Sequence, residues 1–398
     1  MGFTWSLWAA QRINEYQGHV SHYVYVDNLG VASTDQPIVT DAIAQLVEGF
    51  DQRGLLLHGS SVGTEVETLG AEVSGALWRT RVAQKRFWLI RQALNGLLRR
   101  RRLTGWAVEV LVGHCTFAGL LSRGTLSVFH AVYAFMRKSY AEPSVLWHEA
   151  RKELETFRGL LIFLESDWAL QWNDLVVATD SSLEAGAVAT TRWPRSLVAE
   201  VGRAQERARF RGPAAAETDG AAGAALEAAG FWRDADGEWR LAEGVVDDDE
   251  QAAAWEAGPS FPEVHAAGLA SSRWRTEQVQ RWRFGEGILT EEARALVIGV
   301  RRVAQSAFGA ACRQLILSDN MSVVVSFNRS RAKEFALLVQ VRRFQAYCLA
   351  RNLKVSVRWV LSELNPADYG SRVFDKKGAK ESLGALLPDT FFLRGVQV

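Results

Sequence analysis

Two aspartates stand where an apolar pattern ends. Asp180 follows an apolar and β-branched run at residues 175–179, and Asp319 follows a similar run at residues 313–318. Runs of this length and composition predict buried β-strands. A carboxylate at the end of a buried strand is costly unless something binds it. Taken alone, Asp180 is better interpreted as a solvated turn residue than as a metal ligand, so the further carboxylates decide the question.

Two more carboxylates lie at predicted helix starts. Glu292 falls in the first turn of a helix pattern that begins at Ile288, and Leu296 and Val300 share its face. That spacing allows Glu292 to point inward, while a solvated start to the helix is an equally good interpretation. Asp368 follows Pro366, a residue suited to opening a short helix. Four converging carboxylates would repel one another, and two Mg²⁺ ions, or Mn²⁺ in their place, would neutralise them.

The order strand-Asp, helix-Glu, strand-Asp, helix-Asp resembles the active site of ribonuclease H. The segment Asn365-Pro-Ala-Asp-Tyr-Gly-Ser-Arg372 resembles the closing motif of that domain in retrotransposon polyproteins. The resemblance implies that Asp180, Glu292, Asp319 and Asp368 are both catalytic and metal-binding residues, with Asp180 bridging two ions. The implied substrate is the RNA strand of an RNA/DNA hybrid, recognised by its 2′-hydroxyls. No histidine lies near Asp368, although some family members have one there.

The N-terminal segment predicts a strand, a tight turn and a second strand over residues 20–32, then a helix over residues 38–53. Together with Thr68-Leu-Gly70, these elements resemble the second half of a reverse transcriptase palm. The resemblance covers nearly the whole chain outside residues 213–260, and it matches gypsy-like and DIRS-like retrotransposons. The implied remnant of the polymerase site consists of Gly2, Ser6, Tyr25, Asp27 and Asn28.

Two departures from the palm pattern bear on polymerase activity. Asn28 stands where the family carries a second aspartate, and the earlier motif with another metal-binding aspartate would lie before residue 1. Two-metal phosphoryl transfer needs those carboxylates. We therefore expect an incomplete polymerase in this chain alone. A partner chain that supplies the missing palm and fingers would restore it.

Residues 79–102 contain nine Lys or Arg and no acid, interleaved with apolar residues. This composition predicts a basic amphipathic helix. A charge run is usually a solvated face, but the absence of acids favours contact with phosphates. Eight of the cations are the candidate nucleic-acid contacts: Arg79, Arg81, Lys85, Arg86, Arg99, Arg100, Arg101 and Arg102.

The net charge of +1 conceals a strong asymmetry. Residues 213–260 carry twelve acids and two arginines, so this segment has a net charge of −10 and the remainder has +11. The segment is rich in Ala and Gly and cannot bury enough apolar surface to order itself, except around Phe231 and Trp239. We expect an acidic insertion, while the basic remainder could attract a polyanion.

These patterns predict an α/β (α+β) protein in three parts. Residues 1–75 would form the partial palm, residues 76–168 a helical thumb and connection, and residues 169–398 a ribonuclease H-like mixed sheet with flanking helices. The helical part includes residues 105–138 and a helix at 147–164 with Glu149, Glu153 and Glu155 on its polar side.

The cysteines, histidines and apolar runs bear on the cellular compartment and on the class of protein. The three cysteines are scattered and the seven histidines form no paired spacing, so neither a disulfide framework nor a zinc site is expected. Apolar runs are interrupted by polar residues and no leader opens the chain, which favours an intracellular protein, cytoplasmic or nuclear, that contacts no membrane. The alternative to an active nuclease is a non-catalytic nucleic-acid-binding relic of a decayed retroelement.

Overall fold

The computed structural model describes residues 21–25, 28–52, 54, 59–211, 231–233, 239–241, 256–257 and 261–375. By its contacts the chain divides into two compact units. Unit 1 comprises Met1–Phe87, Glu165–Trp168 and Phe210–Ala257, and unit 2 comprises Trp88–Leu164, Ala169–Arg209 and Gly258–Val398. Most of the predicted helical part thus falls in one unit with the predicted nuclease sheet.

Unit 1 contains the predicted hairpin and helix. Strands β1 (Ser21–Tyr25) and β2 (Asn28–Ala32) pair antiparallel, with Tyr25 opposite Asn28. Helix α2 (Gln36–Asp51) follows and buries Ala42 and Leu46. Both predicted strands and the predicted helix are confirmed, the helix two residues earlier than predicted, while the turn at residues 26–27 lies outside the described residues.

Unit 1 also contains a four-stranded antiparallel sheet. It runs β3 (Glu65–Thr68), β4 (Ala71–Ser74), β5 (Arg79–Val82) and β8 (Glu165–Asp167). The prediction that a helix covers residues 79–102 is therefore wrong at its start, because residues 79–82 form strand β5. Arg and a β-branched residue alternate there, which suits a strand with one covered face.

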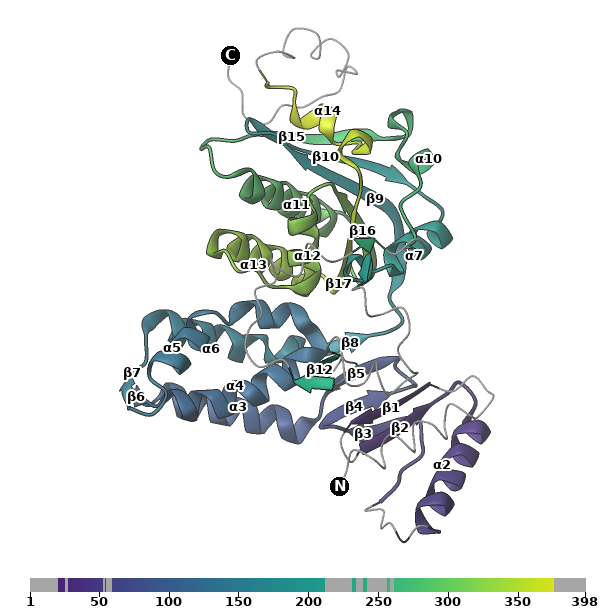
Figure 1. Ribbon diagram of the computed structural model, residues 1–398, viewed down its shortest axis with the longest axis vertical. Coiled ribbons are helices and arrows are strands. Elements are labelled where there is room, and N and C mark those ends of the chain that lie inside the picture. Colours follow the sequence, from purple (N-terminus) through teal and green to yellow (C-terminus); the bar gives the residue numbers. More distant parts are fainter. Residues whose placement is uncertain are drawn as a thin grey trace. The chain divides into compact units, whose positions relative to one another are not determined.

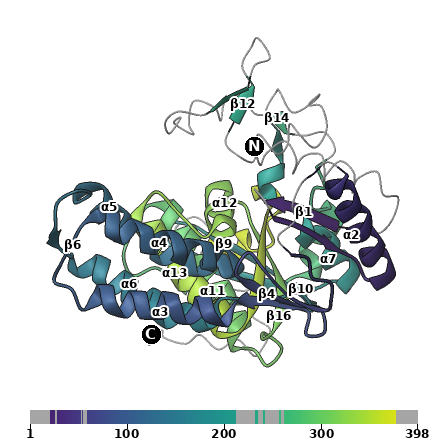
Figure 2. The ribbon, with the colours of Figure 1, turned by 90° about the horizontal axis from the view of Figure 1, so that it is seen from below.

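The first part of unit 2 is helical, as predicted. Its main helices are α3 (Gln84–Leu98), which begins within unit 1, α4 (Gly105–Gly119), α5 (Ala131–Lys138) and α6 (His148–Leu160). Short elements link them: β6 (Arg102–Leu103), η1 (Leu120–Val128), β7 (Ser144–Val145) and η2 (Leu161–Phe163). Figures 1 and 2 place α4, α5 and α6 side by side, and their shared core includes Val108, Phe135 and Phe157, each fully buried.

One described stretch, Gly105–Val128, is long and apolar enough by length and composition to cross a membrane. Glu109 and Arg123 interrupt this stretch, as expected for the apolar runs of the sequence. Within the stretch the backbone leaves helical geometry at Ser122, inside η1, and 39% of the apolar window is buried inside the protein. Its buried residues belong to the core of the helical part.

A five-stranded mixed sheet forms the centre of unit 2 (Figure 1). Its order is β15 (Arg275–Arg281), β10 (Ala185–Arg192), β9 (Gln171–Ser181), β16 (Cys312–Ser318) and β17 (Leu353–Trp359). The first three strands pair antiparallel, whereas β9, β16 and β17 run parallel. The predicted mixed sheet is confirmed.

Helices cover both faces of this sheet. Helices α11 (Ile288–Gln305), α12 (Met321–Arg329) and α13 (Phe335–Ala350) share a core with Val177 on one face. Helix α7 (Arg195–Arg203) and the short α10 (Ala266–Leu269) share a core with Val176 on the other. Successive residues of β9 thus serve opposite cores, as the period of a strand requires. The predicted mixed α/β fold is confirmed.

Helix α13 fastens the helical part to the sheet. Arg342 donates to the carbonyl oxygens of Ser127 (2.9 Å) and Val128 (2.6 Å) and to the Glu153 carboxylate (2.9 Å). Glu153 is buried and also accepts from the amides of His130 and Val132 at the start of α5. Glu153, expected on the polar side of α6, is buried there, and its carboxylate satisfies the first amides of a neighbouring helix.

The two ends of the acidic insertion lie beside each other in unit 2. Arg209, just before the insertion, pairs bidentately with Glu263, just after it. Among the described residues between them, β12 (Phe231–Arg233) pairs with β13 (Trp239–Leu241), and β11 (Phe210–Arg211) pairs with β14 (Glu256–Ala257). Because the Arg209–Glu263 pair already holds the two ends together, a short flexible segment should be able to connect them.

Replacing residues 214–258 with a short Gly/Ser linker should preserve cooperative thermal melting of the protein. Affinity for a nucleic-acid duplex at low salt should rise, because the replaced segment carries a net charge of −10. Calorimetric melting and duplex binding at two salt concentrations would measure both. Loss of the cooperative transition would mean that the insertion is structural.

Candidate metal centre

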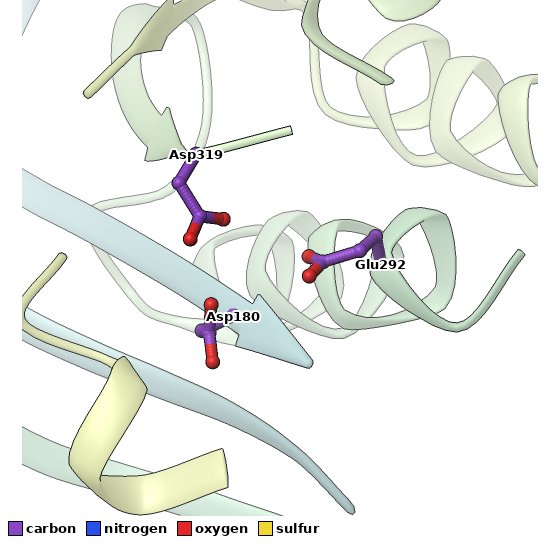
Figure 3. A group of neighbouring side chains, drawn as sticks. All are labelled: Asp180, Glu292 and Asp319. Atoms are coloured by element: carbon purple, nitrogen blue, oxygen red, sulfur yellow. The ribbon is translucent and has the colours of Figure 1, made fainter. Parts of the chain in front are cut away.

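Three of the four predicted carboxylates converge at one end of the five-stranded sheet. Asp180 is the penultimate residue of strand β9, Glu292 lies near the start of α11, and Asp319 directly follows β16. Figure 3 shows their carboxylates turned toward a common space. One oxygen from each lies within 4.8 Å of the others. Strands β9 and β16 are parallel neighbours, so their carboxyl ends bring Asp180 and Asp319 to the same edge of the sheet.

Neutral side chains hold the two aspartates in place. Asn365 donates to Asp180 Oδ1 at 3.2 Å, and the Ser371 hydroxyl donates to Asp180 Oδ2. The Ser362 hydroxyl donates to Asp319 Oδ2 at 2.7 Å. These donors belong to the loop after β17 and to the short helix α14 (Asp368–Ser371). The segment that resembles the closing motif thus contacts the Asp180 carboxylate through Asn365 and Ser371.

The electrostatics of the cluster favour a bound cation. Burial, then the charges of Asp180 and Asp319, raise the pKa of Glu292 to about 9. Burial, then the charge of Asp319, raise the pKa of Asp180 to about 7. Glu292 Oε2 and Asp319 Oδ1 are buried and have no hydrogen-bond partner within the described part of the chain. Carboxylate oxygens without donors are the ligands that Mg²⁺ prefers, so these residues fit the ion implied by the sequence.

Asp368, the fourth predicted carboxylate, is placed differently. Its Oδ1 accepts from Arg372 Nε at 2.7 Å and pairs with Nη2 at 2.6 Å, across one turn of chain. Among the residues described, the group that could hold a metal contains Asp180, Glu292 and Asp319 but not Asp368. Its charge still raises the pKa of Asp180, after the larger effects of burial and of Asp319, so it lies near the cluster.

The cluster opens into a pocket of about 500 Å³. Acidic residues dominate its lining, and the one cation among its lining residues is Arg372. Exposed apolar side chains also line it, with Leu183 67% and Ile288 43% accessible. A phosphate could enter this pocket only if a cation first offset the carboxylates. The lining residues are Asp180, Ser181, Ser182, Leu183, Glu184, Ile288, Glu292, Asp319, Ser362, Arg372 and Asp375.

Glu291 is a buried carboxylate that sequence analysis did not single out. Its side chain has no exposed surface, and Oε1 accepts from the Glu286 amide at 2.9 Å. Arg294 pairs with the Glu286 carboxylate at 2.6 Å. Glu291 therefore holds the loop that leads into α11, which fixes the start of the helix carrying Glu292. Its position beside Glu292 was visible in the sequence, but an exposed helix start explained the pair equally well.

Several predicted nucleic-acid contacts already have partners within the protein. In unit 1, Arg79 pairs with Glu165 at 3.3 Å and Arg81 with Glu72 at 2.7 Å. Arg86 donates to the Leu69 carbonyl at 2.8 Å, over the left-handed turn at Gly70. Lys85 is exposed on α3, and in unit 2 residues 99–102 are exposed. Among the predicted contacts, Lys85 and the arginines at residues 99–102 are therefore exposed, and their contact with phosphates stays a prediction.

The predicted polymerase remnant is only partly visible. Gly2, Ser6 and Asp27 lie outside the described residues. Tyr25 and Asn28 are the paired end residues of β1 and β2.

The carboxylate cluster should make metal-free stability depend on pH. Folded-state pKa values of about 7 for Asp180 and about 9 for Glu292 exceed the ordinary values of 3.8 and 4.5. Between these values the folded protein binds more protons than the unfolded chain. The contribution of the two protonated carboxyls to the free energy of unfolding is therefore fully present below about pH 4, and it is lost as the pH rises toward 7 and 9. In EDTA, the Tm of Asp180→Asn minus the Tm of the parent should increase from pH 5 to pH 9. A difference that stays constant with pH would contradict this electrostatic account.

Comparisons with known proteins give similarity at the level of structure alone. No protein-family model matches the sequence, and no curated protein matches it. A structure of the foamy viral protease-reverse transcriptase dRH with double-stranded DNA matches at 11% identity and a TM-score of 0.33, covering 89% of this chain and 49% of that one. A structure of the foamy viral protease-reverse transcriptase with an RNA/DNA hybrid matches at 11% identity and a TM-score of 0.30, covering 94% and 60%. This chain therefore spans about half to three fifths of the length of the proteins it resembles.

Proposed function

We propose that this chain is a nuclease of the ribonuclease H type, which uses divalent metal ions to hydrolyse the RNA strand of RNA/DNA hybrids. The observation that carries the proposal is the convergence of Asp180, Glu292 and Asp319 at the edge of a mixed sheet, with two buried oxygens awaiting a partner. The retroelement origin implied by the sequence motifs belongs to the same proposal.

Asp180, Glu292 and Asp319 would hold Mg²⁺ or Mn²⁺. When bound, such an ion supplies charge stabilisation and lowers the pKa of a water molecule, which is the chemistry that phosphodiester hydrolysis needs. The protein's own contribution is to fix the carboxylates. Asn365, Ser371 and Ser362 are neutral donors to the carboxylate oxygens of Asp180 and Asp319, and so they would orient these ligands without cancelling their charge.

Asp368 completes the proposed set of four carboxylates. It lies near Asp180 but shares its charge with Arg372, which lines the pocket. A substrate phosphate is a competing anion for Arg372, because a guanidinium binds phosphate and carboxylate in the same bidentate manner. We propose that substrate phosphate draws Arg372 away and leaves Asp368 available to the second ion.

Nucleic acid would be held by the cations beyond the pocket. The exposed residues 99–102, all arginines, follow α3 in the same unit as the carboxylates. Phosphate contacts of this kind provide affinity that weakens with salt and does not depend on sequence. DNA synthesis is not part of the proposal for the isolated chain, because Asn28 removes one of the carboxylates that a polymerase site requires.

Cleavage of a labelled hybrid tests the function. With Mg²⁺ present, the full chain should shorten the RNA strand of an RNA/DNA hybrid and leave its DNA strand, double-stranded DNA and single-stranded RNA intact. EDTA should stop the reaction. Binding of the hybrid without cleavage in Mg²⁺ or Mn²⁺ would overturn the nuclease and favour the non-catalytic relic.

A further inference from the structure

The acidic insertion is anchored on the residue that holds one of the proposed metal ligands. We infer that Trp359, at the end of β17, is a positioning residue for Asp319 and that the two stems of the insertion, residues 206–209 and 261–263, hold Trp359 in place. This inference rests on the proposed metal centre and adds a route by which the insertion influences it.

Trp359 makes a direct contact with Asp319. Its indole Nε1 donates to the Asp319 carbonyl oxygen at 2.8 Å. Beside it, the Val360 amide donates to the Ser318 carbonyl at 3.1 Å, which joins the ends of β16 and β17. The carbonyl of Asp319 is part of the backbone that sets the direction of its carboxylate. Outer hydrogen bonds of this type orient metal ligands and govern the affinity of the site.

The first stem holds Trp359 from the opposite side. Glu206 is fully buried, and its Oε1 accepts from the Trp359 amide at 3.0 Å and from Arg358 Nε at 2.6 Å. Its other oxygen accepts from Arg209 Nε at 2.7 Å. The Arg209 guanidinium lies 4.8 Å from the centre of the Trp359 ring, a cation-π contact.

The second stem closes the same network. Glu263 pairs with Arg209, and Arg358 donates to the Pro262 carbonyl at 2.6 Å. Phe261 lies under both guanidinium groups, 4.5 Å from that of Arg209 and 5.2 Å from that of Arg358. Both ends of the insertion therefore converge on two buried cations, of which Arg209 lies against the Trp359 ring and Arg358 precedes Trp359 on β17. A displacement of either stem would shift Trp359 and, through the hydrogen bond of its indole, the backbone of Asp319.

Trp359→Phe is the direct test, because it keeps an aromatic ring and removes the N–H donor. Thermal melting over a Mg²⁺ titration gives the concentration at which half of the metal-dependent stabilisation is reached. That midpoint should rise about ten-fold in Trp359→Phe while the metal-free Tm stays close to the parent's. Cleavage of the hybrid should fall at limiting Mg²⁺ and recover at high Mg²⁺, which a merely structural defect would not do.

Trp193→Phe is the matched control. Trp193 is buried in the same unit, and its indole nitrogen has no hydrogen-bond partner among the described residues. The same substitution there removes no donor contact, so the Mg²⁺ midpoint should match the parent's. Equal midpoints for Trp359→Phe and Trp193→Phe would overturn the inference about Trp359.

Glu263→Gln tests the stem by weakening its pair with the buried Arg209, and the substituted side chain is itself 56% exposed. Its Mg²⁺ midpoint should lie between those of the parent and Trp359→Phe. A midpoint equal to the parent's would overturn the role of the stems. If the parent itself shows no stabilisation by Mg²⁺, the proposed metal centre fails and the inference fails with it, which separates that outcome from the other two.

Discussion

Asp180→Asn should abolish cleavage of the RNA strand, lowering the rate by about 1,000-fold or more, and should leave the metal-free protein at least as stable as the parent at pH 8. The asparagine has the shape of the aspartate it replaces, so it can still accept from Asn365 and contact Ser371. It removes a buried charge beside Asp319 and Glu292, and the high pKa of Asp180 reports how unfavourable that charge is.

The same substitution should remove the response to metal. At ten times its Kd, Mg²⁺ would stabilise the parent by about 1.4 kcal/mol, or about 3 °C in Tm. Asp180→Asn should show little of this shift. Asp174→Asn is the control on the same strand, because Asp174 pairs at the surface with Arg192 and lies outside the cluster. Cleavage and Mg²⁺ response that are identical in Asp180→Asn and Asp174→Asn would mean that the site does not exist.

Arg358→Met should lower the free energy of unfolding by about 3–5 kcal/mol, the largest stability effect we expect from a single change. Arg358 has no exposed surface and pairs with Glu206, which is equally buried. Removing the cation leaves one oxygen of a buried carboxylate and two carbonyl oxygens, those of Val201 and Pro262, without their hydrogen-bond donor. Denaturant unfolding of the purified protein would measure the loss.

Arg192→Met is the matched control for that experiment. Arg192 also pairs with a carboxylate, but its side chain is 64% exposed. Such a pair contributes about 0–1 kcal/mol because water and salt screen it. If Arg358→Met were no more destabilising than Arg192→Met, the network around Glu206 would not anchor the stems of the insertion as described.

The strands that carry the aspartates could be predicted because their signal is local. The runs at residues 175–179 and 313–318 each fall inside a strand of the sheet. The face of α11 could also be predicted, since Leu296 and Val300 share it with Glu292 and all three are buried. Whether Glu292 pointed inward could not be decided locally, because an exposed helix start fits the same residues.

Other features depend on partners far away in the sequence. Glu206 and Arg358 meet across 152 positions, and Glu153 and Arg342 across 189. Neither residue of such a pair carries a local pattern that identifies the other. Asp368 presents the reverse case, because Arg372 lies one helical turn away. The sequence contained that pairing, but the choice between a nearby cation and a distant metal cluster depends on three-dimensional geometry.

The binding of Mn²⁺ to the protein without nucleic acid tests the metal centre most directly. Free Mn²⁺ has a strong electron paramagnetic resonance signal that falls when the ion binds, and Mg²⁺ should compete for the same site. The account predicts saturable binding that Asp180→Asn and Asp319→Asn each remove and that Asp174→Asn retains. Equal Mn²⁺ binding by the parent and all three variants would contradict the claim that Asp180, Glu292 and Asp319 form one site.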